Sequence, residues 1–123
     1  MTDFTLLPFD LPAVQRKKVT AAFDGGLISS DGGVVLLRGA ERNLGLADLL
    51  AACLSDRRDP ARVIHRLADM LRFRMLAIAC GYEDADDCDT LRFDPLFKMG
   101  VGHAPGSGRD LCSQPTMSRL ENM

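Results

Sequence analysis

The sequence predicts a mainly α-helical fold of about five or six helices, with one or two short β-strands near the N-terminus. Two observations support this prediction. Apolar residues recur at spacings of three and four over several stretches, as they do along the buried face of a helix. Aspartate followed by proline, which is typical of helix starts, occurs at Asp59-Pro60 and Asp94-Pro95, and glycines stand where the apolar patterns end.

Length and composition limit the classes of protein to which the chain can belong. Its 123 residues fit one domain, and its 46% apolar and 26% charged residues are typical of a globular fold. The longest wholly apolar run, Met75 to Cys80, has six residues, whereas a membrane helix needs about 20. The N-terminus lacks the basic start and apolar core of a secretory signal. We therefore expect a cytoplasmic chain with no membrane partner.

The N-terminal region is expected to contain little regular structure. Residues 1–18 hold two prolines among scattered apolar residues and end in Arg16-Lys17-Lys18, so we expect a poorly ordered basic arm. The helical region then spans residues 19–123. It opens with a short stretch at 19–23, which predicts a strand ended by the turn at Asp24-Gly25-Gly26.

Three helices are predicted in the middle of the chain. The first two cover residues 34–44 and 46–54, with Asp31 placed to cap the first and Gly45 placed to stop it. The third and clearest covers residues 61–80, between Asp59-Pro60 and Gly81. Its expected apolar stripe consists of Ile64, Leu67, Leu71, Met75 and Ile78.

Residues 83–89 hold five acidic side chains in seven positions, which two interpretations explain. Acids stabilise the N-terminal end of a helix, and helices are predicted through Cys88–Phe93 and after Asp94-Pro95. Alternatively, the carboxylates bind a divalent cation such as magnesium or calcium. The spacing lacks the glycine and the distant glutamate of an EF-hand loop, so we favour helix capping. The four cysteines show no CxxC spacing, which predicts neither a zinc site nor a disulfide framework.

Residues 113–122 predict a last helix that a serine caps, with Met117 and Leu120 as its apolar pair. A recognition helix presents polar side chains from its first turns to phosphates and base edges, although an ordinary surface helix can have the same composition. The candidate DNA-binding residues of this helix are Gln114, Thr116, Ser118, Arg119 and Asn122.

A second basic stretch adds Arg57 and Arg58 to the candidate DNA-binding residues. Residues 56–74 contain six arginines against three aspartates, although the whole chain has a formal net charge of −2. Such a stretch suits weak, salt-sensitive contact with phosphates, and it equally suits a solvated helix face of paired charges. His65 and His103 have no assignable catalytic partner, and we find no sequence-local catalytic motif.

Four strings of the sequence together resemble a known family. In chain order they are residues 20–33 (TAAFDGGLISSDGG), 56–60 (DRRDP), 71–87 (LRFRMLAIACGYEDADD) and 113–122 (SQPTMSRLEN). They resemble the N-terminal region of bacterial insertion-sequence transposases of the DDE type, in the group-one class. The resemblance runs in order from about residue 19 to the end of the chain.

The resemblance implies a role in DNA transposition. In that family an RNase H-like core uses two aspartates and a glutamate to hold two divalent metal ions, with Mg²⁺ expected for the full-length enzymes. That core begins after the string at 113–119, so no residue of this chain matches the catalytic, metal-binding acids. We therefore expect the N-terminal part of an RNase H-like transposase, a truncated copy without catalysis that contacts the terminal repeats of the transposon.

Two other functions also fit the residues. A helical interaction module would use its apolar surfaces, those of Met117 and Leu120 included, to pack on a core domain or on a full-length transposase. A divalent-metal-binding enzyme would instead be built on the acids at 83–89.

Overall fold

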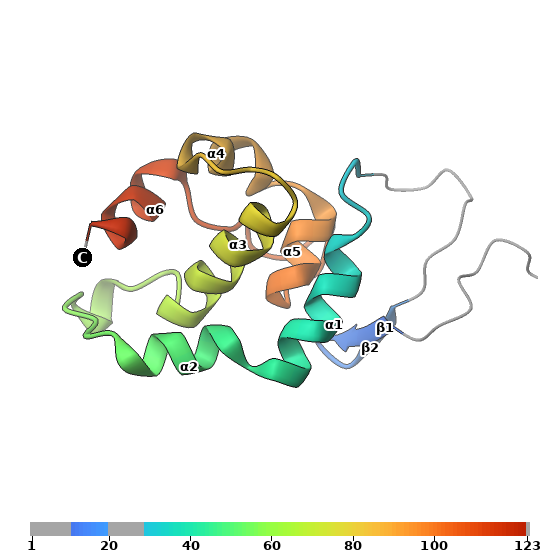
Figure 1. The fold of residues 1–123 in the computed structure, drawn as a ribbon, viewed down its shortest axis with the longest axis horizontal. Helices are drawn as coiled ribbons and strands as arrows, with labels where there is room; N and C mark the ends of the chain where they lie inside the picture. The colour runs from blue at the N-terminus through green and yellow to red at the C-terminus, as the bar shows by residue number, and fades with distance from the viewer. Residues whose placement is uncertain (1–10, 20–28, 123) are drawn as a thin grey trace, which may run out of the picture.

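The computed structural model describes residues 11–19 and 29–122. In this part of the chain, six α-helices and two single turns of 3-10 helix accompany one two-stranded antiparallel sheet, which confirms the mainly α-helical prediction. Figure 1 shows the helices gathered around α3, with the sheet beside α1 at one end. None of the described helices is long and apolar enough to cross a membrane.

The sheet is a tight hairpin of β1 (Leu11–Val14) and β2 (Lys17–Val19). Its two turn residues, Gln15 and Arg16, both have positive φ, as tight hairpin turns require. Regular structure at 11–19 therefore corrects the expectation of a poorly ordered arm for this stretch. The sequence lacks the glycine or asparagine that usually marks such a turn. The predicted strand at 19–23 lies outside the described residues, except for Val19 at the end of β2.

Contacts from α1 (Val34–Leu44) hold the hairpin against the helices. The buried Arg38 donates from Nη1 to the carbonyl oxygens of Pro12 and Ala13, at 3.1 and 3.0 Å. The predicted side-chain cap of α1 is wrong in its accepting atom, because the amide of Val34 bonds the backbone oxygen of Asp31 and no side chain among the described residues caps the helix. The Asp31 carboxylate instead accepts a hydrogen bond from the Tyr82 hydroxyl, at 2.9 Å.

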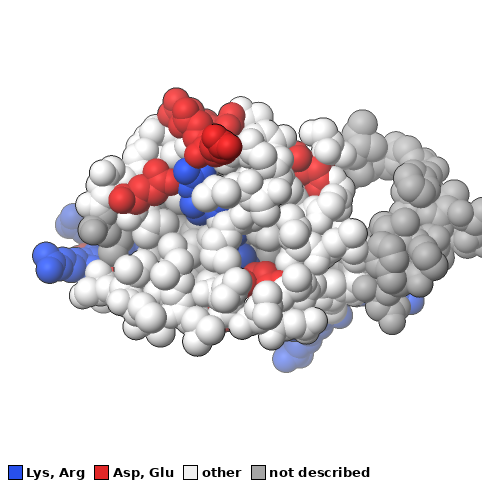
Figure 2. Space-filling view, in the orientation of Figure 1, with Lys and Arg blue, Asp and Glu red and all other residues white. Residues whose placement is uncertain are grey.

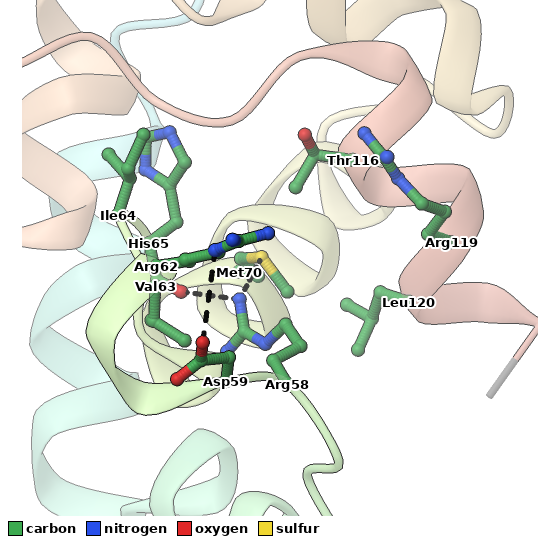
Figure 3. Close-up of a pocket in the computed structure, with 10 residues that line it drawn as sticks. All are labelled: Arg58, Asp59, Arg62, Val63, Ile64, His65, Met70, Thr116, Arg119 and Leu120. Atoms are coloured by element: carbon green, nitrogen blue, oxygen red, sulfur yellow. Dashed lines mark hydrogen bonds and ion pairs between the residues drawn. The ribbon is translucent and has the colours of Figure 1, made fainter.

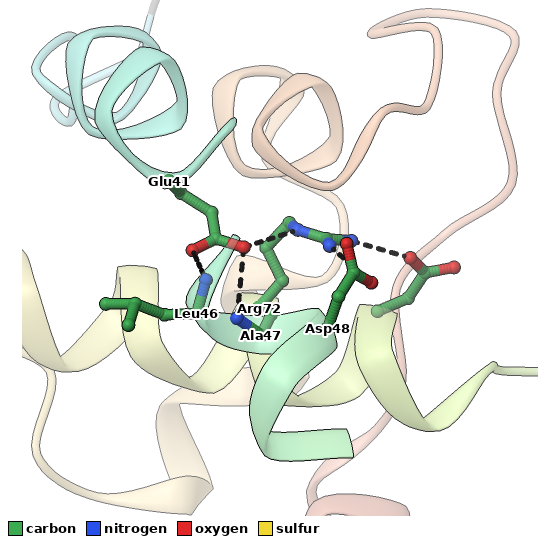
Figure 4. A network of polar contacts seen from close by, with 6 residues as sticks. Glu41, Leu46, Ala47, Asp48 and Arg72 are labelled. Carbon is green, nitrogen blue, oxygen red and sulfur yellow. Dashed lines mark hydrogen bonds and ion pairs between the residues drawn. The ribbon is translucent and has the colours of Figure 1, made fainter. Parts of the chain in front are cut away.

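A left-handed glycine joins α1 to α2 (Leu46–Cys53), as predicted. Gly45 has φ of 65°, and its amide bonds the carbonyl of Glu41 at 2.7 Å. The buried Glu41 carboxylate also accepts from the first two amides of α2, at 3.1 and 3.2 Å, and from Arg72 Nε at 3.3 Å. Arg72 further pairs with Asp48 and Asp69, at 3.3 and 3.0 Å. We call these charged residues the Glu41–Arg72 network (Figure 4).

The central helix α3 (Leu67–Ala79) is shorter than the predicted helix over 61–80. Asp59 does cap a helical start, since its Oδ1 accepts from the Ala61 amide at 3.0 Å, but only one 3-10 turn, η1 (Pro60–Arg62), follows. Residues 63–66 then leave the helical conformation. The predicted apolar stripe fails at both ends, because Ile64 and Ile78 are 66% and 49% exposed. The buried face of α3 is broader and includes Met70, Phe73, Leu76 and Ala77.

The core forms where α5 (Pro95–Val101) approaches α1 and α3. Phe97 meets Phe73 edge to face, with ring centroids 5.9 Å apart. A Cβ added at Gly100 would lie 2.8 Å from a methyl of Leu76 and 2.9 Å from a methyl of Val34, so only glycine permits this approach without a shift. The predicted start at Asp94 is confirmed, because its Oδ1 accepts from the first free amides of α5.

The acidic segment forms η2 (Ala85–Asp87) and α4 (Cys88–Leu91), which both contact the last helix. Asp84 accepts from the amide of Asp86 at 3.0 Å, which confirms helix capping for this residue. The last helix, α6 (Gln114–Glu121), buries Met117 and Leu120 in the same core as α3. The expectation that these two residues face an absent core domain is therefore wrong. All four cysteines are free.

Candidate nucleic-acid interface

A hollow of about 410 Å³ lies between α6 and the segment that precedes α3. Figure 3 shows Arg58 and Arg62 on one side of it, Thr116, Arg119 and Leu120 on the other, and Met70 of α3 between them. We call it the arginine hollow. Its lining residues are Arg58, Asp59, Arg62, Val63, Ile64, His65, Met70, Thr116, Arg119 and Leu120.

A second hollow, of about 630 Å³, shares Arg58 with the first. Its remaining lining residues are Leu54, Ser55, Arg57 and Asn122. Five of the seven candidate DNA-binding residues from the sequence therefore line two adjoining hollows, although more than fifty positions separate the two groups in the chain. The structure brings together Arg57, Arg58, Thr116, Arg119 and Asn122.

The other two candidates, Gln114 and Ser118, line neither hollow. The Gln114 side chain donates from Nε2 to the Ser118 hydroxyl, at 2.7 Å. These two side chains therefore form a hydrogen bond with each other along one face of α6.

The start of α6 is held from a distant part of the chain. Ser113 occupies the predicted capping position, but its hydroxyl lies 3.3 Å from the Thr116 hydroxyl and makes no capping bond to the backbone. The amide of Gln114 instead donates to Asp89 Oδ1, at 2.8 Å. Asp89 thus satisfies an N-terminal amide of α6, where the helix macrodipole also favours a carboxylate. With Met117 and Leu120 buried on its other side, α6 presents the exposed Arg119 from an anchored helix.

Arg58 is held rigidly by partners on two sides. Its guanidinium bonds both carboxylate oxygens of Asp56, at 2.9 and 2.7 Å, in the forked geometry that suits arginine. Its Nη1 also donates to the backbone oxygen of His65, at 2.7 Å. The hydrogen bond from Arg58 lowers the pKa of the exposed Asp56 carboxyl to about 2. Arg58 therefore positions the wall of the hollow, and Asp56 balances its charge.

Three other arginines at the hollows are far less engaged. The Arg62 side chain is 89% exposed, and its nearest carboxylate oxygen belongs to Asp59 at 3.8 Å. Arg57 and Arg119 are exposed, and neither has an ion-pair or hydrogen-bond partner among the described residues. Their guanidinium groups are consequently available to an anion from solution.

His65 lies on the wall of the arginine hollow and is partly buried. Burial lowers the pKa of its ring below the ordinary 6.5, and the positive charges of Arg109 and Arg92 lower it further. Arg109 also donates from Nη1 to the backbone oxygen of Ile64, at 3.0 Å. The non-helical link at 63–66 is thus fixed by Arg58 on one side and Arg109 on the other.

The acids of the segment 83–89 were the candidates for a divalent-metal centre. No group of three or more histidine, cysteine, aspartate or glutamate side chains is arranged to hold a metal ion in residues 11–19 and 29–122. Asp84 and Asp89, from the acidic segment, cap helical turns. The Mg²⁺ that the family resemblance implies is therefore assigned to no side chain here.

Sequence reasoning missed Arg62 and Ile64 as parts of this surface. It placed both on one long helix, where Arg62 would have been an ordinary solvent-facing residue and Ile64 a core residue. The Asp59-Pro60 signal correctly marked a helical start, but the turn ends at Arg62, and Arg58 and Arg109 donate to backbone oxygens of the link that follows. The closely spaced arginines at 57, 58 and 62 were the available local signal.

Comparison with known families defines the class to which this helical chain belongs. A family model described as transposase DDE domain group 1 matches residues 11–123. The chain therefore belongs to this family of DDE transposases, as its four sequence strings indicated, and the family supports a role in DNA transposition. No curated protein and no solved structure matches the chain.

Proposed function

We propose that the two hollows form a DNA-contacting surface that binds the terminal repeats of a transposon during transposition. The observation that carries this proposal is the meeting of exposed Arg57, Arg62 and Arg119 from two distant segments, with Thr116 and Asn122 beside them. Because the chain belongs to a family of transposases, DNA is the ligand that we propose for this surface.

Local charge supports the proposal more strongly than the composition of the whole chain. The full sequence has a formal net charge of −2. Around the two hollows, four arginines (57, 58, 62 and 119) stand against two aspartates (56 and 59), and Asp56 is already occupied by Arg58. A local excess of positive charge attracts phosphates and releases counterions on binding, which makes the contact salt-sensitive.

The residues of the surface have different tasks in this proposal. Arg119 is the principal contact because its fork of donors matches either guanine or a phosphate. Thr116 and Asn122 add polar groups of shorter reach, and Arg57 and Arg62 contact the backbone. Arg58 acts mainly by holding the link at 63–66. Gln114 and Ser118 contribute less because they bond to one another.

We further infer that these 123 residues contact DNA without cutting it. The family resemblance places the metal-holding acids after the string at 113–119, and the described acids at 84 and 89 serve helix termini. Clean protein incubated with a transposon-end duplex and Mg²⁺ or Mn²⁺ should leave both strands intact. Metal-dependent cleavage that disappears on mutation of a residue of this chain would contradict the inference.

Fluorescence anisotropy with a labelled transposon-end duplex tests the proposed surface. Arg119→Ala should weaken binding by about 1–3 kcal/mol if the guanidinium contacts a base, or reduce the salt slope by about one if it contacts a phosphate. Arg42→Ala is the matched control, because it removes the same charge from exposed Arg42 on α1, which lines a different hollow. Wild-type curves for Arg119→Ala at every salt concentration would remove α6 from the interface.

A second candidate function, a helical interaction module, is favoured by the surface of α2. Large apolar side chains stand exposed along this helix and just after it, at Leu46, Leu49, Leu50 and Leu54. Exposed apolar rows of this kind promote association, and a full-length transposase is the partner we propose for it. Sedimentation of the chain with full-length transposase should show a complex that Leu49→Glu weakens.

A further inference from the structure

We propose that the arginine hollow receives one unpaired nucleotide of a DNA strand. In this arrangement the base lies against Ile64, Val63 and Leu120, and the phosphates on either side of it meet Arg62 and Arg119. This inference rests on the proposed DNA-contacting function and adds to it the state of the DNA that the site prefers.

The lining of the hollow has two chemical parts, and a nucleotide matches both. Met70 and Leu120 are buried at its inner side, and Val63 and Ile64 continue the apolar wall toward the opening. The hydroxyl of Thr116 is a polar group on the same wall, able to donate to or accept from a base edge. Arginines stand around this apolar surface, so an anion carrying a flat apolar group is the matching ligand.

The volume and the charge of the hollow favour a nucleotide over a single base or over a cationic or neutral apolar ligand. Its space of about 410 Å³ exceeds that of a single base and leaves room for part of the sugar. Three guanidinium groups line it, and of these Arg58 is paired with Asp56, so a cationic or neutral apolar ligand would leave the exposed charges of Arg62 and Arg119 without an anion.

A fully paired duplex cannot use the apolar wall. Its bases are stacked on each other and offer only their edges in the grooves, so the duplex reaches the arginines through phosphates and base edges and presents no flat base face to the apolar wall. An unpaired base exposes its flat face, which can leave water by packing on aliphatic carbon and on a guanidinium plane. The hollow therefore distinguishes unpaired from paired DNA through Ile64, whose side chain is 66% exposed.

The link that carries Ile64 is preorganised for this role. Arg109 bonds the backbone oxygen of Ile64 at 3.0 Å, and Arg58 bonds that of His65 at 2.7 Å. Because the backbone is already fixed, Ile64 is held outward without the entropic cost of ordering a loop on binding. An exposed isoleucine in a fixed link between arginines has no role in the core, which is built from other residues.

Anisotropy titrations with two labelled DNAs of equal length and charge test the inference. One is fully paired, and the other carries a few unpaired nucleotides at one end. The wild-type chain should bind the second about five- to tenfold more tightly, the gain expected from removing part of one base from water. Ile64→Ala should abolish most of this preference, by weakening the binding of the DNA with unpaired nucleotides more than that of the paired DNA. Leu49→Ala, which truncates an equally exposed leucine on α2 outside the hollow, should retain the preference.

The possible outcomes separate this inference from the proposed function. Equal affinity of the wild type for the two DNAs, or a preference that survives in Ile64→Ala, would overturn the nucleotide site and leave the DNA-contacting surface standing. Absence of binding to either DNA would overturn both. Circular dichroism of each variant, matched to the wild type, shows that a lost preference does not come from unfolding.

Discussion

Arginine performs opposite tasks at two sites beside the N-terminal half of α3, where Asp69 and Arg72 belong to the network and Met70 lines the hollow. At the Glu41–Arg72 network, the Arg72 side chain is 17% exposed and meets three carboxylates, those of Glu41, Asp48 and Asp69 (Figure 4). At the arginine hollow, the Arg62 side chain is 89% exposed with one distant carboxylate, and Arg119 has no partner among the described residues (Figure 3).

The difference shows that the supply of carboxylates, and not the number of arginines, separates a structural site from a binding site. Charges removed from water must be paired, and the network pairs them while tying α1 and α2 to α3. Charges left in water cost little to maintain and keep their attraction for an outside anion. Figure 2 shows that basic and acidic side chains are unevenly distributed over the visible face, with the largest acidic group at its top edge and smaller acidic patches elsewhere.

The largest expected effect is on stability, at the buried carboxylate of the network. Glu41→Ala should lower the free energy of unfolding by about 3–5 kcal/mol, because two amides of α2 and the Arg72 guanidinium lose their acceptor. Asp48→Ala removes a 66% exposed partner of the same arginine and should cost less than about 1 kcal/mol. Urea unfolding followed by circular dichroism measures both. Equal losses would show that burial does not distinguish these contacts.

A second effect concerns the anchoring of α6, which presents Arg119. Met117 is fully buried, so Met117→Ala should destabilise the fold by about 2–5 kcal/mol. Leu49→Ala, at a position that is 62% exposed on α2, should change stability by about 0.5 kcal/mol or less. The same urea experiment compares them. If Met117→Ala proved neutral, α6 would not be part of the core.

The pH dependence of His65 gives a smaller but more specific comparison. Burial first, and then Arg109 and Arg92, lower the pKa of the folded ring below 6.5. The unfolded ring therefore binds a proton first, and stability falls as the pH drops below about 6.5 toward the folded pKa. An NMR titration should place the His65 midpoint below 6.5, and phosphates bound in the hollow should raise it. A midpoint that DNA leaves unchanged would contradict binding at this wall.

Local signals in the sequence identified the helices well wherever the capping group is close in the chain. Asp94 caps α5 three residues or fewer from its donors, and Gly45 ends α1 in the left-handed conformation. The predicted length of a helix was wrong where arginine side chains bond the backbone of a non-helical link. The helix predicted from Asp59 stops after one turn, and Arg58 and Arg109 bond the backbone oxygens of His65 and Ile64 in the non-helical link that follows.

The candidate site was predictable in its residue types and not in its arrangement. The polar face of 113–122 and the arginines at 57 and 58 were visible as separate segments of the sequence. Their meeting depends on Met117 and Leu120 packing into the core beside α3, a burial that an apolar pair alone does not specify. The start of α6 likewise depends on Asp89, which stands 25 residues from the amide that it satisfies.

The central claim is that exposed arginines bind DNA whereas paired arginines hold the fold. NMR spectra of the arginine side-chain Nε–Hε groups test it directly, because each guanidinium is observed in one titration with a transposon-end duplex. We predict that the signals of Arg57, Arg62 and Arg119 shift with added DNA and that those of Arg38 and Arg72 do not. Shifts confined to Arg38 and Arg72, or no shift at Arg57, Arg62 and Arg119 under saturating DNA, would contradict the account.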